Sequence, residues 1–363
     1  MKLQPENYKL VNQLDHGTMG IVWQGVEIST GESVAVKVVT LDEETKLEFE
    51  NEMNYLEDFN NQCQYIIDYR GYIIKSNEMW IVLSYSSAGS VADIVQVTQA
   101  PIEELVVATI VASLLLGLDY LHSRGVIHRD IKGKNILLNS KGFVQIADFG
   151  ISKSISESLP NRCTVIGSPH WMAPEIFTDG EYDCKVDVWS LGITMIELVC
   201  LEPPNASTPP LEVIYKIIDD PSPKLPPGFS DSMNDFISRC LTKDPVNRST
   251  SSSLRSHPFV KDAILKLEKG DRSETLRFYN QVIETMDAFA DEISTIEKED
   301  EGKIVEKKRY SFSNSNLKKI LPRFSWGRKS FVDPVDASPV NFSEIAETMQ
   351  NTVEHEIRKV WRK

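Results

Sequence analysis

The stretch that decides the fold reads His-Arg-Asp-Ile-Lys-Gly-Lys-Asn at residues 128–135, and Asp-Phe-Gly follows at residues 148–150. Between them, residues 136–138 and 144–147 are short apolar or alternating runs around Asn-Ser-Lys-Gly at 139–142, which is typical of a β-hairpin. A hairpin places the residues before its first strand and after its second strand at the same end. The sequence therefore predicts that two carboxylates, an amide and an ammonium group gather at one point.

These residue types suit phosphoryl transfer from ATP, in which a protein mainly positions a hydroxyl group and holds Mg²⁺ against the phosphates. Asp130 is predicted to accept the proton of the attacking hydroxyl, and Lys132 to neutralise charge that develops on the γ-phosphate. Asn135 and Asp148 are predicted as Mg²⁺ ligands, because this ion takes a few protein oxygens together with phosphate oxygens. Either short motif alone is weak evidence, whereas both in this order and spacing argue against chance.

In this pattern the chain resembles the eukaryotic protein kinases. The resemblance covers residues 8–260 and implies an α+β fold of two lobes: a small, β-rich N-lobe with one helix and a larger, mainly helical C-lobe. Lys132, within Asp-Ile-Lys-Gly-Lys-Asn, resembles the serine/threonine branch of the family. Residues 162–175, which read RCTVIGSPHWMAPE, resemble the sterile-20-like group and especially its Hippo-type germinal-centre members.

A second charged pair is predicted in the N-lobe. Residues 34–37 read Val-Ala-Val-Lys and predict a β-strand that ends in Lys37. Glu52 lies in a stripe of apolar residues at helical spacing, where burial without a cation would be costly. The apolar members of this stripe are Phe49, Met53, Leu56 and Phe59. We therefore expect Lys37 to pair with Glu52, rather than with Glu50 off the stripe, and the resemblance implies that activity requires this pair.

The nucleotide loop is predicted at residues 14–22, which resemble the kinase glycine-rich loop. Asp15 stands where the family usually has its first glycine, so we expect less backbone freedom there and weaker ATP affinity rather than lost chemistry. The residues of this loop are Leu14, Asp15, His16, Gly17, Thr18, Met19, Gly20, Ile21 and Val22.

The adenine site comes from the resemblance alone. Residues 80–85 predict a buried strand that runs into the hinge, with Leu83 as gatekeeper and Tyr85 at the hinge. Val22, Ala35 and Leu137 are expected to pack against the base. Packing within the core explains each of these apolar residues equally well.

Control elements are predicted around Arg129, a cation beside Asp130 that is expected to be buried or half-buried. The resemblance implies that a phosphate on the activation loop pairs with this arginine and orders the loop. Thr164 is the first candidate for that modification. Ser168 stands where the pattern usually has threonine and keeps the hydroxyl group that helps to position the catalytic aspartate and lysine. The alternative for the remaining serines of this loop is a solvated surface position.

Two further charged residues are assigned structural roles by the resemblance. Asp187 resembles the aspartate that anchors the catalytic loop, and Arg248 resembles the arginine that pairs with Glu175. Breaking such a buried pair on one side costs about 3 to 5 kcal/mol.

Composition limits the class of protein. The 363 residues exceed a single core and fit a two-lobed enzyme with an extension. The net charge of −14 argues against nucleic-acid binding. Five scattered cysteines and an N-terminus without a signal-type apolar core predict a cytoplasmic protein. The uncharged residues 105–118 are too short to span a bilayer and predict a buried helix.

Beyond the kinase-like region 8–260, we expect a helical extension at 261–300, a basic and aromatic linker at 301–335 and an amphipathic segment at 336–363. Residues 303–330 carry nine Lys or Arg and one Glu. Three interpretations stay open for them: contact with an anionic membrane or acidic partner, autoinhibitory docking on the acidic lobes, or a solvated linker with phosphorylation sites.

The sequence thus predicts an ATP- and Mg²⁺-dependent serine/threonine protein kinase that acts on protein substrates. An upstream kinase, or the protein itself in trans, is expected to activate it at Thr164. A homodimer is an open alternative. One rival function is a pseudokinase scaffold with weak ATP binding, which Asp15 alone supports. The other is a small-molecule or lipid kinase, which Lys132 and the Gly-Ser-Pro at 167–169 disfavour.

Overall fold

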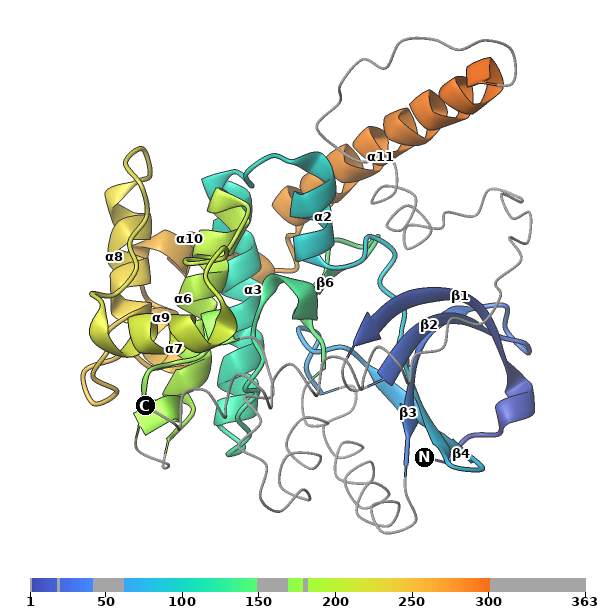
Figure 1. The fold of residues 1–363 in the computed structure, drawn as a ribbon, viewed down its shortest axis with the longest axis horizontal. Helices are drawn as coiled ribbons and strands as arrows, with labels where there is room; N and C mark the ends of the chain where they lie inside the picture. The colour runs from blue at the N-terminus through green and yellow to red at the C-terminus, as the bar shows by residue number, and fades with distance from the viewer. Residues whose placement is uncertain (1, 18–19, 42–61, 149–168, 179–181, 301–363) are drawn as a thin grey trace, which may run out of the picture. The chain divides into compact units, whose positions relative to one another are not determined.

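The computed structural model describes residues 2–17, 20–41, 62–148, 169–178 and 182–300, with the backbone alone at 16–17 and 289–300. Within these ranges, a β-sheet region is followed by a mainly helical region (Figure 1). This is the two-lobed α+β fold that the sequence predicts. The expected helix around Glu52 lies outside the described residues.

The N-lobe is one antiparallel sheet with the strand order β1-β2-β3-β5-β4. Its strands are β1 (Tyr8–Gly17), β2 (Gly20–Glu27), β3 (Ser33–Thr40), β4 (Tyr69–Lys75) and β5 (Glu78–Ser84), and the 3₁₀ turn η1 (Pro5–Asn7) precedes them. The predicted Val-Ala-Val-Lys strand is part of β3, which continues to Thr40 instead of ending at Lys37, because residues 38–40 also pair with β5. In β3, Val34 and Val36 are buried in a cluster with Ile73 and Trp80. Because successive side chains of a strand point to opposite faces, Lys37 lies on the other face of the sheet.

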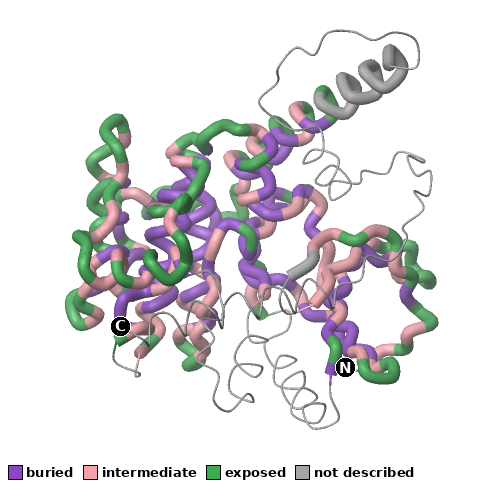
Figure 2. Tube along the Cα trace, in the orientation of Figure 1, coloured by how far each residue is buried: buried purple, intermediate pink, exposed green. Residues whose placement is uncertain are grey.

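The helical region contains two helices that are buried nearly all round, α3 and α6 (Figure 2). Such helices form the core of a domain because they have no solvated face. The α-helices are α2 (Val91–Thr98), α3 (Glu104–His122), α5 (Glu175–Thr178), α6 (Lys185–Cys200), α7 (Pro210–Asp219), α8 (Asp231–Cys240), α9 (Ser251–Leu254), α10 (Pro258–Glu268) and α11 (Ser273–Asp300). The 3₁₀ turns η2 (Gly133–Asn135) and η3 (Pro169–Trp171) complete the region.

By length and composition, α3 is the one helix of the described residues that is long and apolar enough to cross a membrane. Most of it is buried inside the protein, as expected of the core helix predicted at 105–118.

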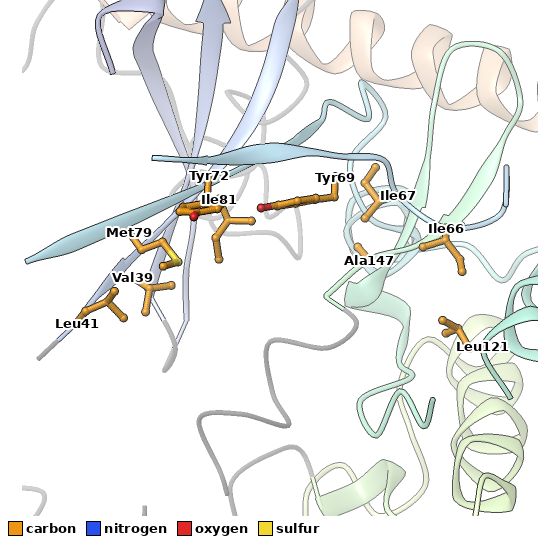
Figure 3. Packing of buried hydrophobic residues seen from close by; sticks show 10 residues of the cluster. All are labelled: Val39, Leu41, Ile66, Ile67, Tyr69, Tyr72, Met79, Ile81, Leu121 and Ala147. Atoms are coloured by element: carbon orange, nitrogen blue, oxygen red, sulfur yellow. The ribbon is translucent and has the colours of Figure 1, made fainter. Parts of the chain in front are cut away.

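One apolar cluster joins the sheet to the helical region (Figure 3). Strands β3, β4 and β5 contribute one part of it, while Leu121 comes from α3 and Ala147 follows the last strand. Its buried members are Val39, Leu41, Ile66, Ile67, Tyr69, Tyr72, Met79, Ile81, Leu121 and Ala147. Burial of these side chains holds the two regions together, since apolar burial stabilises by about 25 cal/mol per Å².

The predicted hairpin between the two catalytic motifs is present. It consists of β6 (Ile136–Leu138) and β7 (Val144–Ile146), which pair in antiparallel register with Ile136 opposite Ile146. The backbone N–H of Ala147 donates to the carbonyl oxygen of Asn135 at 2.8 Å. Asn135 and the residue that follows Ala147, Asp148, therefore lie at the same end of the hairpin.

Candidate active site

Three of the predicted catalytic side chains are in direct contact. Lys132 Nζ lies 2.9 Å from Asp130 Oδ1 and 2.8 Å from Asp130 Oδ2. Asn135 Nδ2 donates to Asp130 Oδ2 at 2.8 Å and to the Asp130 carbonyl oxygen at 2.7 Å. These bonds orient the Asp130 carboxylate, and they turn the Asn135 amide so that its nitrogen faces Asp130.

The remaining two polar side chains of the site form a second contact. Lys37 Nζ lies 2.8 Å from Asp148 Oδ1, and the lysine is 6% exposed. Asp148 has a φ of 62°, a conformation that costs a non-glycine residue about 1 to 3 kcal/mol and that clusters at functional sites. In the described residues the partner of Lys37 is thus Asp148, while the expected partner Glu52 lies outside them.

The anchoring role predicted for Asp187 is confirmed. Its carboxylate is fully buried and accepts hydrogen bonds from the backbone N–H groups of His128 at 2.8 Å and Arg129 at 2.7 Å. The ring nitrogen Nε2 of His122, on α3, lies 2.8 Å from the same carboxylate. Arg129 has a φ of 70°, so the Asp187 bond to its amide holds a strained backbone directly before Asp130.

A further buried carboxylate, Glu197 on α6, was not singled out from the sequence. Its Oε2 atom accepts from the backbone N–H of Gly133 at 3.0 Å and from Trp171 Nε1 at 2.9 Å. Burial raises the pKa of this carboxyl, while the bonds from Gly133 and Trp171 lower it. Glu197 thus links the catalytic loop to η3. Its signal in the sequence is that it is the one charged residue among the mostly apolar residues 188–199.

The predicted nucleotide loop spans the β1–β2 turn, of which Thr18 and Met19 lie outside the described residues. Gly20 has a φ of +132°, and a Cβ atom there would come within 2.2 Å of the Val38 carbonyl oxygen. Only glycine fits this position, because the turn approaches the backbone of β3. The reason expected from the sequence was a different one, the approach of the backbone to phosphate.

The missing first glycine causes no strain in this conformation. Asp15 pairs with Val22 across β1 and β2, after an irregularity at Leu14. Asp15 is not among the described non-glycine residues with positive φ. The expected restriction of backbone freedom at Asp15 therefore has no consequence for this strand pairing.

The residues expected around the adenine lie on neighbouring strands. Ala35 of β3 is opposite Leu83 of β5, and Val22 of β2 is opposite Lys37. Leu137 forms a bridge with Ser90 beyond the hinge, and both Leu83 and Leu137 pack against the cluster of Figure 3. Tyr85 follows β5 directly and is half-buried. The sheet thus brings Val22, Ala35 and Leu83 to adjacent positions beside Lys37.

A family model described as the protein kinase domain matches residues 8–260 of this chain. This protein belongs to the protein kinase family. The kinase therefore acts as a phosphotransferase on proteins, and a domain of this family implies ATP and usually a divalent metal ion.

The side chains of the kinase fit a magnesium-bound nucleotide. Asp148 and Asn135 offer a carboxylate and an amide oxygen at one end of the hairpin, and Lys37 adds a cation for phosphate. Mg²⁺ takes few protein oxygens and keeps sites for water and phosphate, so two such ligands suffice. In the described part of the kinase, no group of three or more His, Cys, Asp or Glu residues forms an all-protein metal site.

Of the predicted control residues, Arg129 is described and lies half-buried. Its guanidinium carbon is 5.4 Å from the centre of the Tyr182 ring, within cation–π range. Thr164 and Ser168 lie outside the described residues. The predicted pair of Arg248 and Glu175 is confirmed: the two terminal nitrogens of the guanidinium group, Nη1 and Nη2, donate to the carboxylate at 2.5 and 2.9 Å.

Proposed function

We propose that this kinase transfers the γ-phosphoryl group of ATP to serine and threonine hydroxyls of protein substrates. The observation that carries the proposal is the contact of Asp130 with both Lys132 and Asn135, beside the pair of Lys37 and Asp148. A site of this kind has a base, a cation next to it and two oxygen ligands within one loop and hairpin.

Each residue has a distinct role in the proposal. Asp130 accepts the proton of the substrate hydroxyl, and Lys132 offsets negative charge beside it. Asn135 and Asp148 are the residues that would hold Mg²⁺, and Lys37 is the cation that would contact the phosphates. Bound Mg·ATP supplies the transferable phosphoryl group and the metal charge. The strained backbone at Arg129 and Asp148 supports these roles, because such strain is retained where it orients functional groups.

The finer assignment is to the serine/threonine kinases of the sterile-20-like group. It is supported by Lys132, which lies two residues after Asp130 and contacts its carboxylate. It is also supported by the activation-loop sequence at 162–175 quoted above. A tyrosine kinase has a different arrangement of residues at the position of Lys132.

The decisive test is Asp130→Asn. We expect phosphate transfer from radiolabelled ATP to a basic protein to fall by about 10²- to 10⁴-fold, since a general base contributes about that much. Binding of Mg·ATP should be retained, and it can be measured as the rise in melting temperature that Mg·ATP causes. Asp219→Asn, at an exposed position at the end of α7, is the matched control and should transfer phosphate like the wild type. Undiminished transfer by Asp130→Asn would refute the assigned base.

We further propose that phosphorylation of Thr164, by an upstream kinase or in trans, activates the enzyme through Arg129. Arg129 is half-buried and directly precedes Asp130 in the catalytic loop, so a phosphate bound to its guanidinium would stabilise this loop. Thr164→Ala should lower the rate, and mass spectrometry of the active wild type should find phosphate on Thr164. Equal rates for phosphatase-treated wild type, untreated wild type and Thr164→Ala would contradict this switch.

A further inference from the structure

The helix α11 lies beyond the residues matched to the kinase family, yet its first half is packed against the catalytic domain (Figure 2). Thr275, Tyr279, Val282 and Met286 are 0, 4, 2 and 3% exposed. Their spacing of four, three and four residues puts them on one stripe of the helix. In Figure 1 this part of α11 lies beside α2, and residue contacts join α11 to both α2 and α3.

The stripe begins on the turn of the β6–β7 hairpin. Thr275 Oγ1 donates to the carbonyl oxygen of Gly142 at 2.7 Å. The guanidinium carbon of Arg272 is 3.7 Å from the centre of the Phe143 ring. Gly142 has a φ of +74°, and a Cβ atom on it would come within 3.2 Å of the Leu276 backbone nitrogen. The close approach of α11 is thus possible because Gly142 has no side chain.

The next turn of the helix contacts the segment after the hinge. The Tyr279 hydroxyl lies 3.3 Å from Ser87 Oγ. This segment is bonded to β6, since Ala88 N–H donates to the Leu138 carbonyl at 3.2 Å and Leu138 N–H donates to the Gly89 carbonyl at 3.1 Å. Tyr279 and Thr275 therefore hold two segments that are themselves joined through β6.

These two segments carry the nucleotide-binding residues. The hairpin strands have three residues each, and the end opposite Gly142 bears Asn135 and Asp148. At about 3.3 Å per residue, the six residues from Gly142 to Asp148 span at most about 20 Å, so a shift of the turn is transmitted to these ligands over a short distance. The segment with Ser87 follows Tyr85 at the hinge, where the adenine is expected.

We propose that residues 273–286 of α11 position the β6–β7 hairpin and the segment after the hinge for binding of Mg·ATP, with Thr275 and Tyr279 as positioning residues. This role rests on the proposed kinase activity, because it concerns the nucleotide of that reaction. The two hydroxyl groups set the position of the hairpin and the hinge, while the apolar members of the stripe hold the helix in place.

The test uses variants of the full chain that remove one hydroxyl group and keep the packing. Thr275→Val and Tyr279→Phe should each raise KM for ATP about threefold to tenfold, the range expected for one lost hydrogen bond. The rise of the melting temperature caused by Mg·ATP should shrink in the same variants. Thr275→Ser keeps the hydroxyl group and should restore both values.

Thr285→Val is the matched control, because it makes the same chemical change in the same helix. The Thr285 hydroxyl donates at 2.8 Å to the Gln281 carbonyl of its own helix, so KM for ATP should stay at the wild-type value. A lower melting temperature without nucleotide, with unchanged KM and unchanged nucleotide stabilisation in Thr275→Val and Tyr279→Phe, would overturn the proposal and leave α11 a purely stabilising element. Wild-type protein that binds Mg·ATP without transferring phosphate would instead refute the proposed function, and the binding comparison would still decide the role of α11.

Discussion

Asp187→Asn tests whether one buried carboxylate sets the geometry of the catalytic loop. The substitution keeps the size of the side chain but replaces one oxygen by an N–H₂ group. In the native protein, Oδ1 accepts from the Arg129 N–H, and Oδ2 accepts from the His128 N–H and from His122. In the less damaging orientation the amide oxygen takes the place of Oδ2, and the new N–H₂ group faces the Arg129 N–H.

The size of the effect follows from these contacts. One buried N–H without an acceptor costs about 1 to 3 kcal/mol, and the bonds that remain lose the strength that the negative charge gave them. We expect a loss of about 2 to 4 kcal/mol in the free energy of unfolding. Water does not screen these contacts, because Asp187 is fully buried. For a domain of this size each kcal/mol lowers the melting temperature by about 2 to 4 °C.

The loss of activity should exceed what the loss of stability explains. The Arg129 backbone is strained at a φ of 70°, and Asp187 Oδ1 is the acceptor that holds its amide. When this bond is lost the strain can relax, which moves Asp130. A displacement of about 1 Å at a catalytic group lowers the rate by about 10²-fold. Asp187→Asn should therefore lower kcat by about that factor at a temperature where it is fully folded, while KM for ATP changes little.

The assay combines steady-state phosphorylation of a basic protein with thermal unfolding of the same preparations. Asp119→Asn is the control, since Asp119 pairs at 2.8 Å with the partly exposed Arg255. A partly exposed pair at the surface contributes about 1 kcal/mol or less, and Asp119 pairs with Arg255 rather than with the catalytic loop, so kcat should stay at the wild-type value. If Asp187→Asn had the kcat and melting temperature of Asp119→Asn, the reasoning about the anchored loop would be refuted.

Two further predictions concern buried charges of the helical region. Arg248→Met leaves the Glu175 carboxylate buried without its bidentate partner. The free energy of unfolding, measured with denaturant, should therefore fall by about 3 to 5 kcal/mol. A loss below about 1 kcal/mol would contradict the view that this pair is a stabilising contact. Glu197→Gln keeps an oxygen acceptor for Gly133 and Trp171 but removes a carboxyl whose pKa burial raises above 4.5. The folded wild type binds that proton more tightly than the unfolded chain, so its stability decreases as the pH rises from 4.5 through the raised pKa. Melting temperatures across this range should therefore fall less steeply for the glutamine variant. Parallel curves would count against a carboxylate whose charged form is disfavoured by burial.

Part of the site could be predicted from local sequence. The hairpin between the two motifs was predicted from alternation and turn residues, because neighbours along the chain determine both. The strand that contains Lys37 was predicted for the same reason, although its predicted end at Lys37 was wrong because β3 continues to Thr40. The buried helix α3 was predicted as well. The family pattern also supplied the pair of Glu175 and Arg248, whose members are far apart in the chain.

Other parts of the site depend on which distant segments meet. Glu197 is one of many positions in an apolar helix, and its partners come from the catalytic loop and from η3. Gly20 is required by the carbonyl group of Val38, on a neighbouring strand. No local pattern encodes these contacts.

The amino-acid sequence alone thus determined most of the secondary structure and the chemistry of the motifs, because strands, turns and the spacing of polar groups depend on neighbouring residues. Only the folded arrangement decided that Lys37 contacts Asp148 and that α11 reaches Gly142 and Ser87. The physical reason is that burial and hydrogen bonding depend on partners more than a hundred residues away, and these partners are chosen by the packing of whole elements.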